Sequence, residues 1–170
     1  NSSKVTVVSE VDVDAGDGED VPGYVRRFFA ALIGADLKTH QHESIEYSKE
    51  AKTSYYGMYL SCDDSREHYL YLQLDVSVKR CSFWISGYGT SQSFRFVRDQ
   101  LVDSAPEYWC ASTGEGGRKL QKEVMYIGLE SREFRVDALT SNPKTVAEPL
   151  KAHVTQAFEA LQAAVEEVSG

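Results

Sequence analysis

The chain has 170 residues, a length at which one domain with a single hydrophobic core buries about 70% of the surface of the unfolded chain. No stretch approaches the roughly 18 apolar residues of a membrane span, so we expect a soluble protein without a membrane partner. The formal net charge of −8 disfavours duplex DNA as a partner, because phosphate binding needs lysine and arginine side chains gathered on one face.

The first predicted elements are a strand, an acidic turn and a helix. Valines at alternate positions predict a long strand over residues 4–14. The turn at residues 15–20 is expected to be solvated, since Gly16 stands where a calcium-binding loop starting at Asp12 would need an oxygen ligand. Apolar residues at three- and four-residue steps then predict a helix over residues 22–33, which Gly34 closes.

Residues 38–52 are polar and are expected to form a surface loop. His40 and His42 could face the same side of a strand, but no further ligand stands at the spacing of a metal site, so we expect no metal. Residues 54–62 alternate between two faces and predict a strand. The polar link at residues 63–68 joins this strand to an antiparallel neighbour.

Residues 69–96 are the stretch around which the rest of the sheet is expected to be built. Leucine and valine occupy one parity up to Val78, whereas Tyr69 and Tyr71 fall on the other. The alternation restarts after Arg80 and continues to Gly89. This pattern predicts a central hairpin with one buried face.

The second half of the chain is predicted to contain two helices and a second hairpin. The first helix follows Phe96 and ends near Ser104, and the glycine-rich segment 111–117 follows as a loop. This loop lacks the spacing and the hydroxyl of a phosphate-binding loop, so no cofactor is expected. Residues 124–129 and 133–139 are predicted as a hairpin. An apolar stripe from Leu150 to Val168 predicts a long last helix that starts after Pro149.

These elements predict a single α+β domain over residues 1–170, a mainly antiparallel sheet with an amino-terminal helix and a long carboxy-terminal helix packed on it. Cys62, Cys81 and Cys110 are too few for a disulfide framework, and three reduced, buried cysteines are favoured over one bridge with a free thiol. The chain starts at Asn1 without methionine, and residues 1–3 fit the N-glycosylation pattern, so secreted and cytoplasmic locations both stay open.

Three segments resemble the family of ribosome-inactivating proteins. The strand at residues 4–14 followed by the helix Gly-Tyr-Val-Arg-Arg-Phe-Phe-Ala-Ala-Leu is similar to the opening of that family. The run Leu-Gln-Leu-Asp-Val-Ser at residues 72–77 with Gly-Tyr at 87–88 is similar to its central strands, and Phe-Glu-Ala-Leu at 158–161 resembles a later helix. The order and rough spacing agree over the whole chain.

The resemblance implies cleavage of an N-glycosidic bond to one adenine of ribosomal RNA, with the base stacked between aromatic rings. Trp84 stands where the family has its first tyrosine, Tyr88 is the tyrosine of Gly-Tyr, and Tyr126 is the candidate for the second stacking ring. We therefore expect Trp84, Tyr88 and Tyr126 to bind substrate.

The catalytic residues are not assigned by this resemblance. The family's Glu-x-x-Arg helix would follow the last helix, and the sequence has that pattern only at Glu115 and Arg118, too early and among glycines. The resemblance then implies a shortened or inactive relative, or one chain of a two-chain enzyme whose second protein chain supplies the carboxylate.

The alternative is a non-enzymatic binding module that uses an aromatic sheet face. Such a face anchors a protein partner or stacks on bases. Residues 54–60 and 69–72 are similar to the reader domains of McrB-like modification-dependent restriction systems, which implies modified nucleic acid as a ligand. A third interpretation is that helices cover these aromatic residues as a second core. The face comprises Tyr55, Tyr59, Tyr69, Tyr71, Trp84 and Tyr88.

Overall fold

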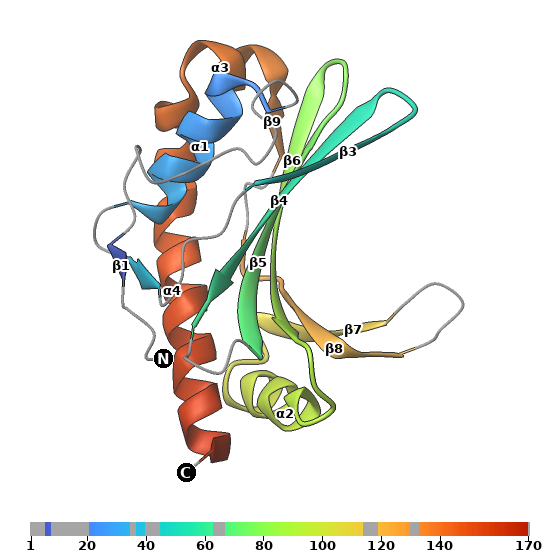
Figure 1. Cartoon of the computed structure of the whole chain (residues 1–170), viewed down its shortest axis with the longest axis vertical. Helices are drawn as coiled ribbons and strands as arrows, with labels where there is room; N and C mark the ends of the chain where they lie inside the picture. Colours follow the sequence, from blue (N-terminus) through green and yellow to red (C-terminus); the bar gives the residue numbers. More distant parts are fainter. Residues whose placement is uncertain are drawn as a thin grey trace.

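The computed structural model describes residues 6–7, 21–34, 37–39, 45–62, 67–113, 119–129 and 133–169. These residues form an antiparallel sheet with helices along one face, so the predicted α+β class is confirmed (Figure 1). The helices are α1 (Gly23–Ile33), α2 (Phe94–Ser104), α3 (Val136–Ser141) and α4 (Pro143–Ser169).

The main sheet has the strand order β3-β4-β5-β6-β8-β7, and β9 pairs with the first residues of β6. The β5–β6 hairpin therefore lies at the centre, as predicted, with Tyr69 opposite Tyr88 and Val76 opposite Cys81. Two short strands, β1 (Thr6–Val7) and β2 (Lys38–Thr39), pair separately. The strands of the main sheet are β3 (Glu46–Glu50), β4 (Thr53–Ser61), β5 (His68–Val76), β6 (Arg80–Gly89), β7 (Trp109–Thr113), β8 (Lys119–Tyr126) and β9 (Glu133–Arg135).

Strand β5 shows how the sequence gives the sheet two different faces. Its residues alternate strictly between buried and half-buried along the whole strand, because successive side chains of a strand point to opposite sides. Leu70, Leu72 and Leu74 are fully buried, whereas Tyr69 and Tyr71 are only half-buried. The leucines therefore face the core, and the tyrosines face the other side of the sheet.

Helices α1 and α4 cover the leucine face. Phe28 of α1 packs edge-on against Phe83 of β6, with ring centroids 5.7 Å apart. Gly34 ends α1 with a positive φ of 68°, and its backbone N–H donates to the carbonyl of Ala30, which is the ending that the sequence predicts. Helix α4 runs lengthwise beside α1 (Figure 1). The predicted amino-terminal and carboxy-terminal helices are thus confirmed.

Helix α4 begins at Pro143, earlier than the predicted start after Pro149. Pro149 removes one backbone donor and leaves the carbonyl of Thr145 without its helical partner. Both residues are exposed, so water can bind this carbonyl and the helix tolerates the proline. The predicted stripe is buried from Leu150 to Val165, but Val168 is 38% exposed.

Two segments predicted as loops contain strands. Residues 46–50 of the polar segment 38–52 form β3, and residues 38–39 form β2. Strand β3 is an edge strand that is exposed on most of its residues, so its sequence lacks the apolar alternation that marks a strand. The glycine-rich segment 111–117 likewise begins with the last residues of β7.

The second predicted hairpin is wrong. Residues 124–126 belong to β8, which pairs with β6 and β7. Residues 133–135 form β9 but pair with β6, and residues 136–139 begin α3. Helix α3 buries Leu139 in the core. A strand could have buried the same side chain, so the short apolar pattern did not distinguish the two structures.

Some predicted features lie outside the described residues. Of the strand predicted over 4–14, only residues 6–7 are described, and they form β1. The acidic turn at 15–20, His40 and His42, and the pair Glu115 and Arg118 all lie outside.

All three cysteines are thiols rather than halves of a disulfide. Cys62 and Cys81 are buried, as expected, but Cys110 is exposed. Burial raises the pKa of the Cys81 thiol to about 12, so this residue is a protonated core side chain at neutral pH.

The packing of Phe83 gives a test of the core. Phe83→Ala should lower the free energy of unfolding by about 3–5 kcal/mol, since it empties a fully buried site against Phe28. The matched control is Phe96→Ala on α2, where the ring is 52% exposed and the expected cost is about 0.5 kcal/mol or less. Urea denaturation of both variants measures the difference, and equal costs would contradict the assignment of faces.

Candidate functional site

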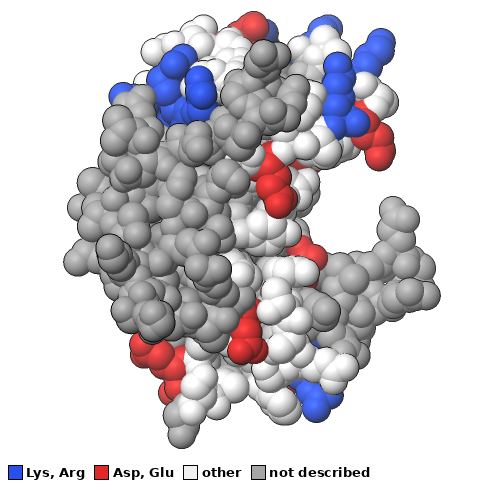
Figure 2. All heavy atoms as spheres, in the orientation of Figure 1, with Lys and Arg blue, Asp and Glu red and all other residues white. Residues whose placement is uncertain are grey.

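Among the residues that the structure describes, no helix lies on the face of the sheet opposite α1 and α4. Figure 1 shows both helices on one side, with β7 and β8 turning away from them at the lower end of the sheet. Figure 2 shows a hollow on the other side, and acidic side chains lie along its visible wall. We call this surface the open face. The strand pairings place the following residues on it: Glu46, Ser48, Glu50, Thr53, Tyr55, Gly57, Tyr59, Ser61, Tyr69, Tyr71, Gln73, Asp75, Arg80, Ser82, Trp84, Ser86, Tyr88, Glu123 and Met125.

Tyr59 is the centre of a cluster of tyrosine rings on the open face. It stands opposite Tyr71 across the β4–β5 pair, and their ring centroids are 4.5 Å apart. Tyr69 and Tyr88 are each 5.7 Å from the same ring, centroid to centroid. Three neighbouring strands thus bring four tyrosines into contact, and none of the described helices lies above them. We call these four residues the tyrosine cluster.

Carboxylates give this cluster a negative environment. Burial and, after it, the charges of Glu46 and Glu123 raise the pKa of Tyr59. Burial, the neighbouring Tyr59 and the charges of Glu46, Asp75 and Glu123 raise the pKa of Tyr71 to about 12. Two carboxylates from strands on either side of the cluster therefore act on the same rings.

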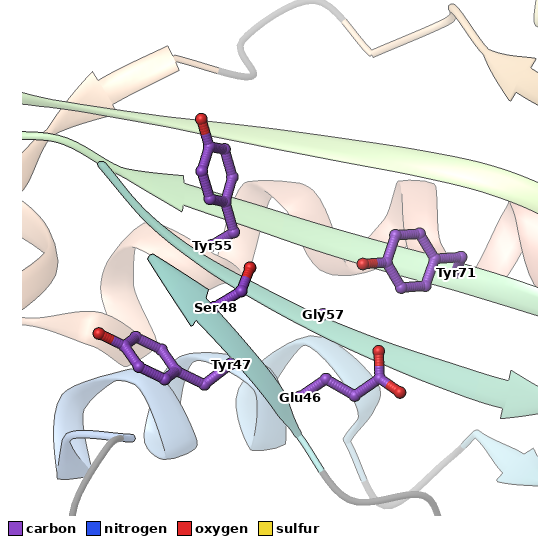
Figure 3. Close-up of a pocket in the computed structure, with 6 residues that line it drawn as sticks. All are labelled: Glu46, Tyr47, Ser48, Tyr55, Gly57 and Tyr71. Atoms are coloured by element: carbon purple, nitrogen blue, oxygen red, sulfur yellow. The ribbon is translucent and has the colours of Figure 1, made fainter. Parts of the chain in front are cut away.

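A pocket of about 360 Å³ lies beside the tyrosine cluster, between β3, β4 and β5 (Figure 3). Gly57 has no side chain, and the hydroxyl of Tyr71 lies over it (Figure 3). A Cβ atom at Gly57 would lie 2.1 Å from that oxygen, so only glycine fits beneath the ring in this arrangement. The lining residues are Glu46, Tyr47, Ser48, Tyr55, Gly57 and Tyr71.

The structure brings Trp84 and Tyr88 to the same face. Both point away from α4, and Tyr88 joins the tyrosine cluster. They are four residues apart on β6, roughly 13 Å along the strand, so they do not form a stacking pair for one base. No helix of the described part of the chain lies over these two residues.

Tyr126, the third predicted substrate-binding residue, lies on the other face. It is 2% exposed, and its ring packs edge-on against Trp109 with centroids 5.1 Å apart. Its hydroxyl donates to Oε1 of Gln156 on α4 at 3.3 Å and lies 3.3 Å from Nδ1 of His153. Burial raises the pKa of Tyr126, with a further contribution from Tyr108.

The sheet therefore separates Trp84 from Tyr126, and the two rings cannot enclose one base. Glu123 stands opposite Tyr88 across the β6–β8 pair and supplies a carboxylate on the open face. The arginine of this face on β6 is Arg80, which pairs with Glu133 at 3.6 Å. Arg80 is roughly 26 Å along the strand from Tyr88. Strand β6 itself thus places no arginine beside Glu123 and Tyr88.

Two residues that shape the site, Glu46 and Gly57, were not predicted from the sequence. Glu46 fell within the segment predicted as a loop, and its neighbours gave no apolar pattern that would reveal β3. Gly57 lies in the stretch 54–62 that was predicted as a strand, but nothing in that pattern marked it as part of a site. Its close approach to Tyr71 depends on the register between β4 and β5, which no local pattern contains.

Among the residues the structure describes, no three His, Cys, Asp or Glu side chains gather closely enough to hold a metal ion. Within the same residues, no helix combines the length and the apolar character needed to cross a membrane. Comparison of the chain with protein-family models, with curated proteins and with solved structures gives no match.

The electrostatics of the cluster give a test by tyrosine titration. The ultraviolet absorbance of tyrosinate should show a tyrosine that ionises at about pH 12 and is lost in Tyr71→Phe. Glu46→Gln should lower that pKa, because it removes a negative charge that disfavours the phenolate. Glu159→Gln on α4 is the control and should leave it unchanged, and a response equal to that of Glu46→Gln would contradict the arrangement.

The same shift predicts a loss of stability at high pH. Between the ordinary tyrosine pKa of 10.0 and about 12, the unfolded chain has released the Tyr71 proton while the folded protein retains it. The contribution of Tyr71 to stability is therefore complete below pH 10 and falls as the pH rises through this window. Urea denaturation at several pH values should show a smaller loss for Tyr71→Phe than for the wild type.

Proposed function

We propose that this protein is a non-catalytic binding module whose open face binds a positively charged segment of a protein partner. The observation that carries the proposal is the tyrosine cluster, which no described helix covers and which has the carboxylates of Glu46, Asp75 and Glu123 near its rings. Aromatic side chains anchor partners at interfaces because each buries a large area at a small cost in conformational entropy.

Charge favours a basic partner. On the open face, strands β3, β4 and β5 carry Glu46, Glu50 and Asp75 but no lysine or arginine. The faces of tyrosine rings attract cations, and nearby carboxylates add to this attraction. A polyanion would meet the opposite potential, so the same face disfavours RNA and modified DNA.

An RNA N-glycosidase activity, alone or with a second chain, stays a prediction from the sequence resemblance. It needs a carboxylate and an arginine that act on one stacked base. The sheet separates Trp84 from Tyr126, so these two rings do not support it, whereas Glu123 supplies a carboxylate beside Tyr88.

Binding of simple charged probes tests the proposal. Fluorescein-labelled decalysine and deca-arginine should bind the wild type, as measured by fluorescence anisotropy, and decaglutamate and oligothymidylate should not. Tyr59→Ala should weaken binding by at least about fivefold, because the central ring of the cluster is lost. Phe96→Ala, which removes an exposed ring on α2, should leave the affinity unchanged.

Rising salt should weaken this binding, because the attraction between exposed charges is screened. Tighter binding of oligothymidylate than of decalysine would contradict the proposal. Release of adenine from ribosomes, lost in Glu123→Gln, would favour the N-glycosidase instead.

A further inference from the structure

The pocket beside the tyrosine cluster has the size of a site for one side chain. Its volume of about 360 Å³ lies at the lower end of the range of ligand pockets, roughly 300–1,000 Å³. Its walls come from three adjacent strands of the sheet: Glu46 and Ser48 from β3, Tyr55 from β4 and Tyr71 from β5. Figure 3 shows Glu46 and Tyr71 on either side of Gly57.

Glu46 is the charged group of this pocket. Its side chain makes no hydrogen bond or ion pair with another residue that the structure describes. Its carboxylate is directed toward Tyr71 (Figure 3), and its charge contributes to the raised pKa of that residue. A carboxylate beside aromatic rings, with no lysine or arginine on this face of the three strands, favours a cation.

Gly57 keeps the pocket in this form. Because it has no Cβ atom, the phenol of Tyr71 can lie flat against β4, where its hydroxyl and ring edge reach the pocket. Ser48 adds a hydroxyl that can accept a hydrogen bond from an ammonium or guanidinium group. The pocket thus combines one negative charge, hydroxyl oxygens and aromatic walls.

We propose that this pocket binds a single ammonium or guanidinium group, supplied by a lysine or arginine side chain of the basic partner segment. The inference rests on the proposed function and deepens it, since it assigns one residue of the partner to one place on the open face. The carboxylate of Glu46 accepts hydrogen bonds from the cation, and the ring of Tyr71 packs against its alkyl stem.

Two substitutions in the pocket and a control test this assignment. Glu46→Gln should weaken decalysine binding by about threefold to fivefold, the effect of one ion pair that is open to water. Glu159→Gln makes the same change of charge on the opposite side of the molecule, on α4, and should leave the affinity unchanged. Comparing the affinities for decalysine and deca-arginine shows whether the pocket prefers an ammonium or a guanidinium group. Circular dichroism checks that each variant is folded.

Gly57→Ala tests the shape of the pocket without changing its charge. The added methyl group displaces the phenol of Tyr71 toward the pocket, so this variant should also weaken decalysine binding by about threefold or more. Tyr71 can move outward because none of the described helices lies over the open face, and the circular dichroism spectrum should stay unchanged. Equal affinities of Glu46→Gln, Gly57→Ala and the wild type would overturn the pocket assignment.

The two proposals fail in different ways. If decalysine binds and Tyr59→Ala weakens it, but both pocket variants bind as the wild type does, the open face is a binding surface and the pocket is not its cation site. If neither decalysine nor deca-arginine binds the wild type, the proposed function itself fails, and the pocket assignment fails with it.

Discussion

The fold depends on the alternation of strand β5 and its neighbours, in which aliphatic side chains point to one side and tyrosines to the other. The aliphatic side buries Leu70, Leu72 and Leu74 beneath two long helices, and this burial supplies the main driving force for folding. The same alternation leaves the tyrosines on a face that the core does not need. Because a shift of one residue would exchange the two faces, the hydrophobic pattern fixes the register and, with it, the position of the tyrosine cluster.

Residues that add nothing to the core shape the site. The tyrosine rings contact one another across three strands, and Gly57 gives Tyr71 the space to lie against the sheet. Glu46 and Glu123 come from strands on either side of the central hairpin and act on the same rings. A face built in this way carries aromatic surface and negative potential together. That combination fits a basic partner better than it fits a nucleic acid.

Helices and strands were predicted correctly from the sequence where one of their faces is buried. An element that is exposed on both faces was missed. The central hairpin, α1 and the stripe of α4 were predicted because their apolar residues recur at the period of a strand or a helix. Strand β3 has exposed residues on both sides and no such period. The true start of α4 was missed because a proline in a sequence usually indicates the beginning or end of a helix. Here Pro149 is exposed in the second turn of α4, where the helix tolerates it.

Of the three residues predicted to bind substrate, two were placed on the same face correctly and the third was not. The alternation along β6 placed Trp84 and Tyr88 on one face. The position of Tyr126 depends instead on the pairing of β8 with β6 and β7, which turns its ring toward α4. This pairing joins strands that are distant in the sequence, so no local pattern contains it.

The most direct measurement is a map of amide chemical-shift changes in the isotopically labelled protein as decalysine is added. We predict changes centred on Glu46, Gly57, Tyr71 and Tyr88, with the amides of α4 little affected. Changes centred on α2 or α4, with the open face unperturbed, would contradict the account.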